Sequence, residues 1–157
     1  MNLEQLFDLA PHGPDVFVGE GHEYPWGGLF GGHIVAQALR AAAYTVSDEL
    51  LPHSLRAYFI RRGDNTQPVR YEVDRIRDGK SFTTRRVVAR QQDGAILNLE
   101  ASFQVHEDSL NEQLVHPHAG LPTPDSIEES SWSTFLERRT IPSAALHGVN
   151  RLGTGHV

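Results

Sequence analysis

Apolar residues recur at helical spacing in one long segment of the N-terminal third. These residues are Ile34, Val35, Ala38, Leu39, Ala42 and Val46. A spacing of three and four residues predicts a helix with one apolar face, which begins at the Gly31-Gly32 pair and ends near Ser47. Because alanine is frequent on this face, a sheet can approach the helix closely, and we expect the helix to be buried.

The next four apolar segments alternate between apolar and polar residues, as strands do. They are His53–Arg61, the segment that begins at Val69, Ser81–Gln91 and Ala95–Val105. In the first of them Leu55, Ala57 and Phe59 share a face, and in the second Ile76 falls out of phase, which indicates a β-bulge. Turns of the Asp-Gly kind join the last three segments. A long helix followed by antiparallel strands predicts an α+β fold.

The two ends of the chain have weaker patterns. Residues 1–30 predict a short helix and a brief strand around Val16–Val18, followed by a glycine-rich approach to the long helix. We place one domain over residues 1–108. Residues 109–157 are expected to be a proline-rich linker, a short helix that a capping box at Ser126–Glu129 begins and Pro142 stops, and an irregular tail.

Composition narrows the class of protein. The chain of 157 residues has the size of one ordinary domain, and no stretch of about 20 apolar residues predicts a membrane span. It has no cysteine, which excludes disulfides, thiolate nucleophiles and cysteine-based metal sites. With an acidic start that lacks the pattern of a secretory signal, the sequence predicts a cytoplasmic protein.

Charge is unevenly distributed. The net charge is −6, but residues 56–90 hold ten of the fourteen basic residues and only four acidic ones, so this stretch carries +6 and the remainder −12. Nine of the ten are arginine, whose planar guanidinium suits phosphate. A small phosphorylated ligand is a reasonable partner, and the acidic remainder argues against nucleic acid. The alternative is a solvated strand face with local ion pairs.

The best chemical candidate is the Gly31-Gly32 entry into the long helix. Helix-start amides have no intrahelical partners and carry a positive partial charge, and glycine lets a ligand oxygen come close. Such a site polarises a carbonyl or holds an oxyanion. The alternative is that the glycines only make a tight turn under the sheet. His116 and His118 have no third ligand nearby, so we expect neither a metal site nor a cofactor.

Five segments resemble the acyl-CoA thioesterase II family. They are Gly28–Leu39, which contains Gly28-Leu29-Phe30-Gly31-Gly32-His33, and Pro52–Asp64, Tyr71–Phe82, Thr84–Ala89 and Ala101–Gln104. The resemblance covers roughly residues 10–106 in consistent order. It implies a hotdog fold, in which an antiparallel sheet wraps a long central helix, and an activity that hydrolyses fatty acyl-CoA to free fatty acid and CoA.

The resemblance also implies that this chain is half of a longer arrangement. Members of the family carry two hotdog units, and their catalytic Asp, Ser or Thr, and Gln belong to the second, whereas this chain resembles the first. Ser54 stands near the place of the Asp and Ala101 near that of the Gln. The alternative function is therefore a non-catalytic hotdog that binds acyl-CoA or has a structural role. We expect a homodimer, with two sheets joined, or association with a second hotdog unit.

Seven residues are the candidates for the site. His53 and Ser81 are the candidate catalytic residues, against the alternatives of a histidine bonded to backbone at a strand start and an exposed strand hydroxyl. The candidate substrate-binding residues are Gly31, Gly32, His33, Arg85 and Arg86. For His33 the alternative is a core histidine, and for the two arginines it is ion pairing across the sheet.

Overall fold

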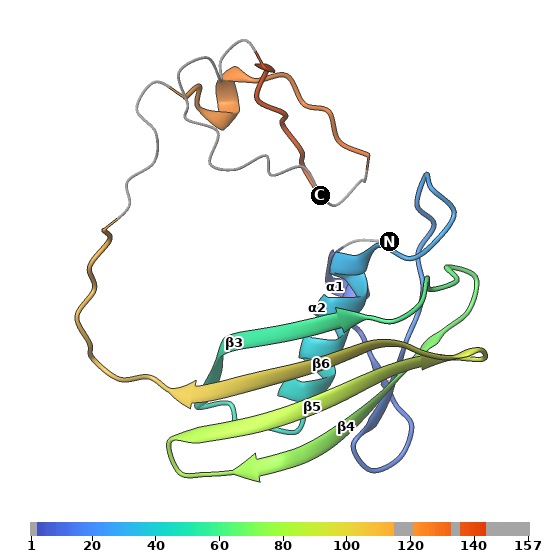
Figure 1. Ribbon diagram of the computed structural model, residues 1–157, viewed down its shortest axis with the longest axis vertical. Coiled ribbons are helices and arrows are strands. Elements are labelled where there is room, and N and C mark those ends of the chain that lie inside the picture. Colours follow the sequence, from blue (N-terminus) through green and yellow to red (C-terminus); the bar gives the residue numbers. More distant parts are fainter. Residues whose placement is uncertain (1–2, 115–120, 133–135, 144–157) are drawn as a thin grey trace, which may run out of the picture. The chain divides into compact units, whose positions relative to one another are not determined.

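The computed structural model describes residues 3–114, 121–132 and 136–143. The chain divides into two units, one ending at Asp108 and the other beginning at Ser109. The first unit holds all the helices and strands that surround the central helix (Figure 1).

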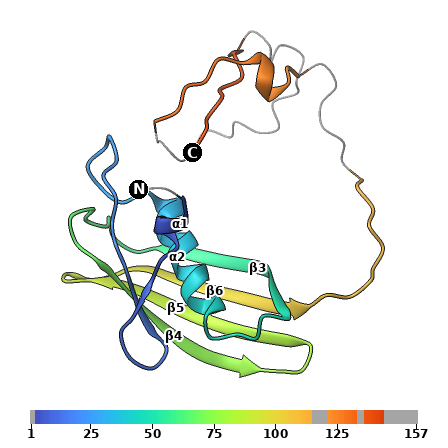
Figure 2. The same cartoon turned by 180° about the vertical axis from the view of Figure 1, so that it is seen from behind.

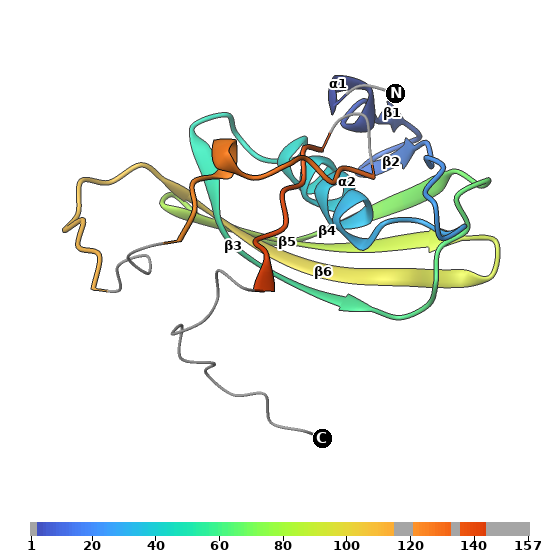
Figure 3. The ribbon, with the colours of Figure 1, turned by 90° about the horizontal axis from the view of Figure 1, so that it is seen from above.

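The central helix, α2, spans Gly31–Ala43 and lies across one face of the sheet (Figures 1 and 3). Ala38, Ala41 and Ala42 have no exposed surface, so their small side chains let the helix axis sit close to the strands. The helix ends earlier than its apolar spacing predicts. Its C-cap is Tyr44, and the hydroxyl of Thr45 donates to the carbonyl of Ala42 (2.8 Å), which closes the last turn.

Six antiparallel strands form one sheet in the order β1-β2-β4-β5-β6-β3 (Figures 1 and 2). The strands are β1 (Ala10–Pro11), β2 (Val16–Gly19), β3 (Leu50–Phe59), β4 (Val69–Asp78), β5 (Phe82–Gln91) and β6 (Gly94–Val105), and a short helix α1 (Leu3–Leu6) precedes them. One main helix on an antiparallel sheet confirms the α+β prediction. It leaves β3 at an edge of the described sheet.

The strand register shifts at three places in the sheet. The bulge predicted at Ile76 is confirmed, since the register of β4 against β5 shifts between Arg75 and Arg77. The other shifts lie in β3 between Pro52 and Ser54 and in β5 between Ala89 and Arg90, and neither was predicted. Beyond the shift in β3, Leu55, Ala57 and Phe59 pair with Ala101, Leu99 and Leu97, as their shared face predicted.

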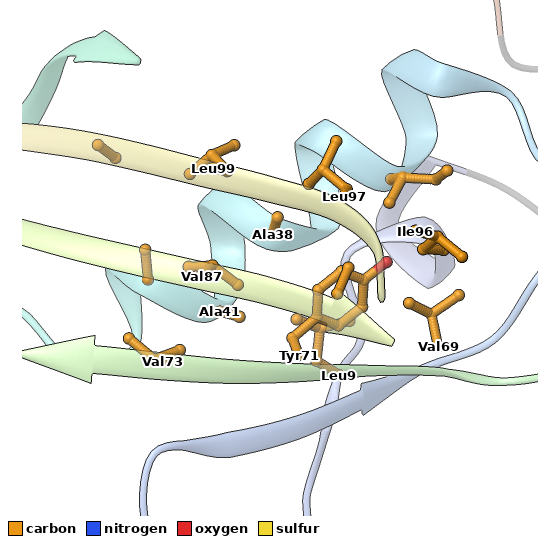
Figure 4. Close-up of a cluster of buried hydrophobic side chains, with 14 of the residues drawn as sticks. Leu9, Ala38, Ala41, Val69, Tyr71, Val73, Val87, Ile96, Leu97 and Leu99 are labelled. Carbon is orange, nitrogen blue, oxygen red and sulfur yellow. The ribbon is translucent and has the colours of Figure 1, made fainter. Parts of the chain in front are cut away.

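The core lies between α2 and the inner face of the sheet (Figure 4). Ala38 and Ala41 of α2 meet side chains of β4, β5 and β6, and the strand residues at the centre have little or no exposed surface. These are Val69, Tyr71, Val73, Val87, Ala89, Leu97, Leu99, Ala101 and Phe103. They alternate along each strand, which is why the period-2 pattern was visible in the sequence.

One buried amide ties the N-terminal segment to the helix. The Gln37 side chain donates to the carbonyl of Leu6 (2.8 Å) and that of Glu20 (3.3 Å), and it accepts the hydroxyl of Tyr71 (2.7 Å). A Cβ at Gly19 would lie 2.6 Å from the Gln37 Oε1 atom. Gly19 is therefore required by packing against this amide.

The second unit corrects the helix expected after Ser126. A 3-10 turn, η1, spans Pro124–Ser126, and residues 127–132 and 136–142 are not helical. Instead, Glu129 forms an isolated bridge with Arg139, whose guanidinium donates to the carbonyls of Pro124 (3.2 Å) and Ile127 (2.6 Å). Arg139 thus takes the Ile127 carbonyl, which the first turn of the expected helix would use. Phe135, His116 and His118 lie outside the described residues.

Candidate ligand site at the start of the central helix

The backbone amides that open α2 have no side-chain cap. Phe30 is the N-cap residue, and the first amide bonded within the helix is that of Ile34, which donates to the Phe30 carbonyl (3.2 Å). The amides of Gly31, Gly32 and His33 come before this bond, at the positive end of the helix. They are suited to polarise a carbonyl group or to hold an oxyanion.

Both glycines are also required by packing. A Cβ at Gly31 would lie 3.0 Å from the Phe59 ring, and a Cβ at Gly32 would lie 2.6 Å from the Phe30 ring. Two aromatic rings thus rest against bare backbone at the helix start. Packing explains the residue type at these positions, and the uncapped amides give them their chemistry.

A shallow cavity of about 340 Å³ adjoins the helix start. Its lining residues are Leu29, Gly31, Ile34, Phe59, Ile60, Arg61, Arg62 and Gly63. Apolar side chains therefore lie beside one backbone amide and two guanidinium groups. No carboxylate belongs to the lining among the described residues. Such a cavity suits an uncharged chain with a polar, electron-rich end.

The positive charges of Arg61 and Arg62 are not neutralised by a described carboxylate. Arg61 donates to the carbonyl of Ala95 (2.8 Å) and Arg62 to that of Trp26, and neither forms an ion pair with a described carboxylate. Asp64 is close in sequence, but its carboxylate accepts bonds from Thr66 and Gln67, which hold the pKa of Asp64 below its usual value. The cavity therefore has a positively charged rim.

His33 lies in the core and not in the cavity. Its side chain is only 2% exposed, and its Nδ1 atom lies 2.9 Å from the hydroxyl of Tyr24. Burial lowers the pKa of His33 to about 4, so the imidazole is neutral near pH 7. This placement matches the core-histidine alternative and argues against contact with a ligand.

The structure separates His53 and Ser81 from the helix start. The His53 Nε2 atom lies 2.8 Å from the hydroxyl of Ser102, and the ring meets Phe82 edge-on, next to Ser81. Ser102 alternates with inward-facing residues, so this pair lies on the outer face of the sheet, opposite α2. Six residues of strand, about 20 Å, separate His53 from Phe59 at the cavity. This chain therefore does not bring its predicted catalytic residues to Gly31 and Gly32.

Arg85 and Arg86 point to opposite faces of β5. Arg85 faces inward with its side chain 1% exposed, and its guanidinium donates to Thr45, Thr84, Arg77 and Asp78. A guanidinium so enclosed and so fully bonded is not available to CoA phosphates. Arg86 is exposed on the outer face and donates to the Asn98 side chain (3.3 Å). Only Arg86 keeps a position from which it can meet a phosphate.

Sequence reasoning missed the residues that surround the helix start in space. Phe59, Arg61 and Arg62 reach it because the Leu29 amide donates to the carbonyl of Gly63 (3.0 Å), a contact over 34 residues. Tyr24 reaches it through His33. Periodicity along the chain carries no signal for such pairings, although the arginine pair directly after a strand was visible.

In the described part of the chain, no group of three or more His, Asp or Glu side chains has the arrangement of a metal site. Among the same residues, no helix has the length and apolar character needed to cross a membrane.

Comparison with known proteins shows the family. A family model described as the acyl-CoA thioesterase N-terminal domain matches residues 22–104, more than half of the chain. Acyl-coenzyme A thioesterase 8 of Mus musculus is 37% identical over 159 aligned residues, which cover 99% of this chain and 49% of the mouse protein.

Solved structures agree with this match. The tesB protein of Mycobacterium avium subs paratuberculosis is 39% identical with a TM-score of 0.69, over 80% of this chain and 48% of that one. A protein of unknown function with a hot dog fold, from Alicyclobacillus acidocaldarius, has a TM-score of 0.70 at 21% identity, over 82% and 48% of the two chains. The latter confirms the hotdog fold alone.

The matches also show how much of each relative this chain covers. It spans about half the length of the relatives that it matches. The segment that the family model matches holds α2, the strands β3 to β5, nearly all of β6, and the cavity at the helix start. The chain belongs to the acyl-CoA thioesterase II family, and its matching segment is that family's N-terminal hotdog domain.

Proposed function

We propose that the chain takes part in the hydrolysis of fatty acyl-CoA to free fatty acid and CoA, as the first hotdog unit of a two-unit thioesterase. The observation that supports this most is the uncapped start of α2 beside an apolar cavity with an arginine rim. It is found in a chain whose family acts on this kind of ester.

In this proposal the α2 start holds the thioester carbonyl. Water attacks the carbonyl carbon, and the oxygen, now negatively charged, accepts bonds from the amides of Gly31 and Gly32. The carbon–sulfur bond then breaks, the acid is released, and the CoA sulfur takes a proton. The apolar lining receives the start of the acyl chain, and Arg61 and Arg62 stabilise negative charge nearby.

The base that activates the water comes, in this proposal, from a second hotdog unit. No described residue that lines the cavity has a carboxylate. The similarity of this chain to relatives about twice as long supports a partner unit of the same kind. A second copy of this chain is the homodimeric form of the same arrangement.

We propose that the second unit docks along β3. This edge strand exposes Leu55 (45%) and Phe59 (61%) on the side of α2. Beside the start of β3, a groove of about 1180 Å³ runs along α2, with Leu39, Ala43 and Leu50 among its lining. An apolar edge next to an apolar helix flank supports a sheet that continues into a partner.

Sedimentation of matched variants tests this docking. Leu55→Glu places a charge on the α2 side of β3, and we expect it to turn a dimer into a monomer at micromolar concentration. Tyr58→Glu changes a residue of the same strand on the outer face that is somewhat more exposed (57%), and it is the control, which stays dimeric. A wild-type chain that is monomeric throughout rejects the homodimer.

The alternative is a non-catalytic half that binds acyl-CoA, and the cavity without a carboxylate favours it. Release of CoA thiol from acyl-CoA, followed with a thiol-reactive dye, separates the two. The protein has no cysteine, so it adds no background. Turnover well above a buffer blank supports a catalytic chain. Binding of acyl-CoA without turnover supports the binding half, and absence of both rejects the proposed function.

We also propose a cytoplasmic location. A chain without cysteine does not need an oxidising compartment to fold. Fractionation of cells that express a tagged chain tests this, with recovery among the cytosolic proteins as the expected result and recovery in a sealed organelle as the contrary one.

A further inference from the structure

Tyr24 lies where the loop before α2 meets the first turn of the helix. It is 5% exposed, and its hydroxyl lies 2.9 Å from the Nδ1 atom of His33, which is buried as well. The imidazole is also close to the Glu20 backbone and the Gln37 side chain, which act against the lowering of its pKa by burial. A buried phenol thus holds one side of a buried imidazole.

Both partners of this hydrogen bond are uncharged near pH 7. Burial raises the pKa of Tyr24 to about 12, so the phenol keeps its proton, and the pKa of His33 near 4 makes the imidazole neutral. The phenol can then donate to Nδ1 or accept a proton from it, according to the tautomer of His33. With the phenol as donor, the imidazole proton is on Nε2.

The Tyr24 ring also organises the aromatic side chains around the helix start. It stacks on Trp26, with ring centres 5.1 Å apart and planes within 7°, and it contacts Phe30 at 5.8 Å. Phe30 is the N-cap of α2, and its ring rests against Gly32. Tyr24 thus touches the helix start twice, through His33 and through Phe30.

We propose that Tyr24 is a positioning residue for the α2 start, which fixes where the Gly31 and Gly32 amides point and so sets the affinity for a thioester carbonyl. The phenol holds the first turn by the His33 imidazole, and the ring holds the N-cap by Phe30. Loss of the hydroxyl frees the first turn without changing any group that touches the ligand. This inference rests on the proposed function of the same site.

A pair of Tyr→Phe variants separates positioning from stability. Tyr24→Phe removes the bond to His33, and Tyr71→Phe removes another buried phenol bond, to Gln37, on β4. The probe is 2-oxododecyl-CoA, a ketone that has a carbonyl near the CoA sulfur and cannot be hydrolysed. We expect Tyr24→Phe to weaken its binding about fivefold and Tyr71→Phe to change it by less than about twofold.

Nuclear magnetic resonance supplies two readouts that a general loss of stability does not move. In the wild type, the imidazole ¹⁵N spectrum shows His33 protonated at Nε2, and in Tyr24→Phe this preference is lost. The ketone shifts the amide signals of Gly31 and Gly32 in the wild type, and this shift shrinks in Tyr24→Phe only. Equal binding and equal shifts in the two variants overturn the inference.

A second pair covers the case in which Tyr24→Phe folds poorly. His33→Asn keeps an acceptor for the phenol and His33→Leu, of similar shape, does not, so we expect affinity to survive in the first and fall in the second. Equal affinities overturn the inference. A wild-type chain that binds no ketone rejects the proposed function and the inference with it, whereas binding that no variant weakens rejects the inference alone.

Discussion

The two ends of α2 are bonded in opposite ways. At the C-terminal end, Arg85 donates to the carbonyl of Thr45 (2.9 Å) and to its hydroxyl (2.7 Å), and that hydroxyl donates to Ala42. At the N-terminal end, Phe30 supplies no side-chain hydrogen bond to the amides of Gly31 and Gly32. One end is closed by a buried cation, and the other is left open.

This difference separates a structural end from the end at which we propose that a ligand binds. A cation at a helix C-terminus complements the negative end of the dipole, and a buried guanidinium that is fully bonded costs little to keep. Free amides at the other end are unfavourable unless water or a ligand oxygen accepts their bonds. The open end therefore retains the capacity to bind that the closed end has lost.

Removing the cation is expected to have the largest effect. Arg85→Leu leaves the Thr45 carbonyl without its partner and creates a cavity, so we expect the free energy of unfolding to fall by about 4 kcal/mol. Urea unfolding measures it. Arg86→Leu, the exposed neighbour, is the control and changes stability by less than about 0.5 kcal/mol. Similar losses in both variants contradict a buried clamp.

The pH dependence of the free energy of unfolding tests the burial of His33 in the first turn of α2. The unfolded imidazole takes a proton near pH 6.5, whereas burial lowers the pKa of His33 in the fold to about 4. Between these values only the unfolded chain binds the proton, so stability is lost as the pH falls from about 6.5 to 4, by roughly 3 kcal/mol. In His33→Asn this part of the slope disappears. An unchanged slope of unfolding free energy against pH contradicts the assignment.

Thr45→Val separates the contribution of the Thr45 hydroxyl from that of the Thr45 carbonyl. It removes the hydroxyl that links Arg85 to Ala42 but keeps the shape of the side chain and the Thr45 carbonyl. We expect a loss of about 1–2 kcal/mol, less than for Arg85→Leu. Thermal unfolding compares the two. A loss equal to that of Arg85→Leu would show that the hydroxyl, and not the carbonyl, is the main anchor.

Gly32→Ala is expected to have the smallest effect on stability. Helix propensity and packing against Phe30 predict opposite signs for this effect. Alanine normally stabilises a helix relative to glycine by about 1 kcal/mol. Here its Cβ lies 2.6 Å from the Phe30 ring, so the ring must move, and we expect a net loss of about 1 kcal/mol. Chemical unfolding checks the sign. A gain in stability means that Phe30 yields freely and does not fix the helix start.

Most of the first unit was predictable because its elements are locally consistent. Six alternating residues from Ala95 to Val105 predicted β6, and the phase error at Ile76 predicted its bulge. The bulge at His53 leaves no such phase error, since neither Pro52 nor Ser54 on either side of it belongs to the apolar alternation. The prediction of a helix after Ser126 is wrong for the described residues, where Arg139, 12 residues further along the chain, donates to the Ile127 carbonyl that the first turn of that helix would use.

The site was predictable only where local chemistry defines it. Gly31 and Gly32 were identified because a glycine pair at a helix start is visible in sequence. Arg85 was predicted to bind substrate, with ion pairing as the alternative, and it alternates in phase with Thr83, Val87 and Ala89, all of which face the core. Phase along a strand was therefore a better guide to Arg85 than residue type. The Tyr24–His33 contact needed the three-dimensional fold.

The contact between Gly19 and Gln37 has a consequence for how this sequence can change over time. Because a Cβ at position 19 would meet the amide of Gln37, a larger residue there is tolerated only after position 37 is shortened. Shortening Gln37 alone, however, releases Leu6, Glu20 and Tyr71 together. Neither substitution is neutral as a first step, so we expect the residues at positions 19 and 37 to change together or not at all.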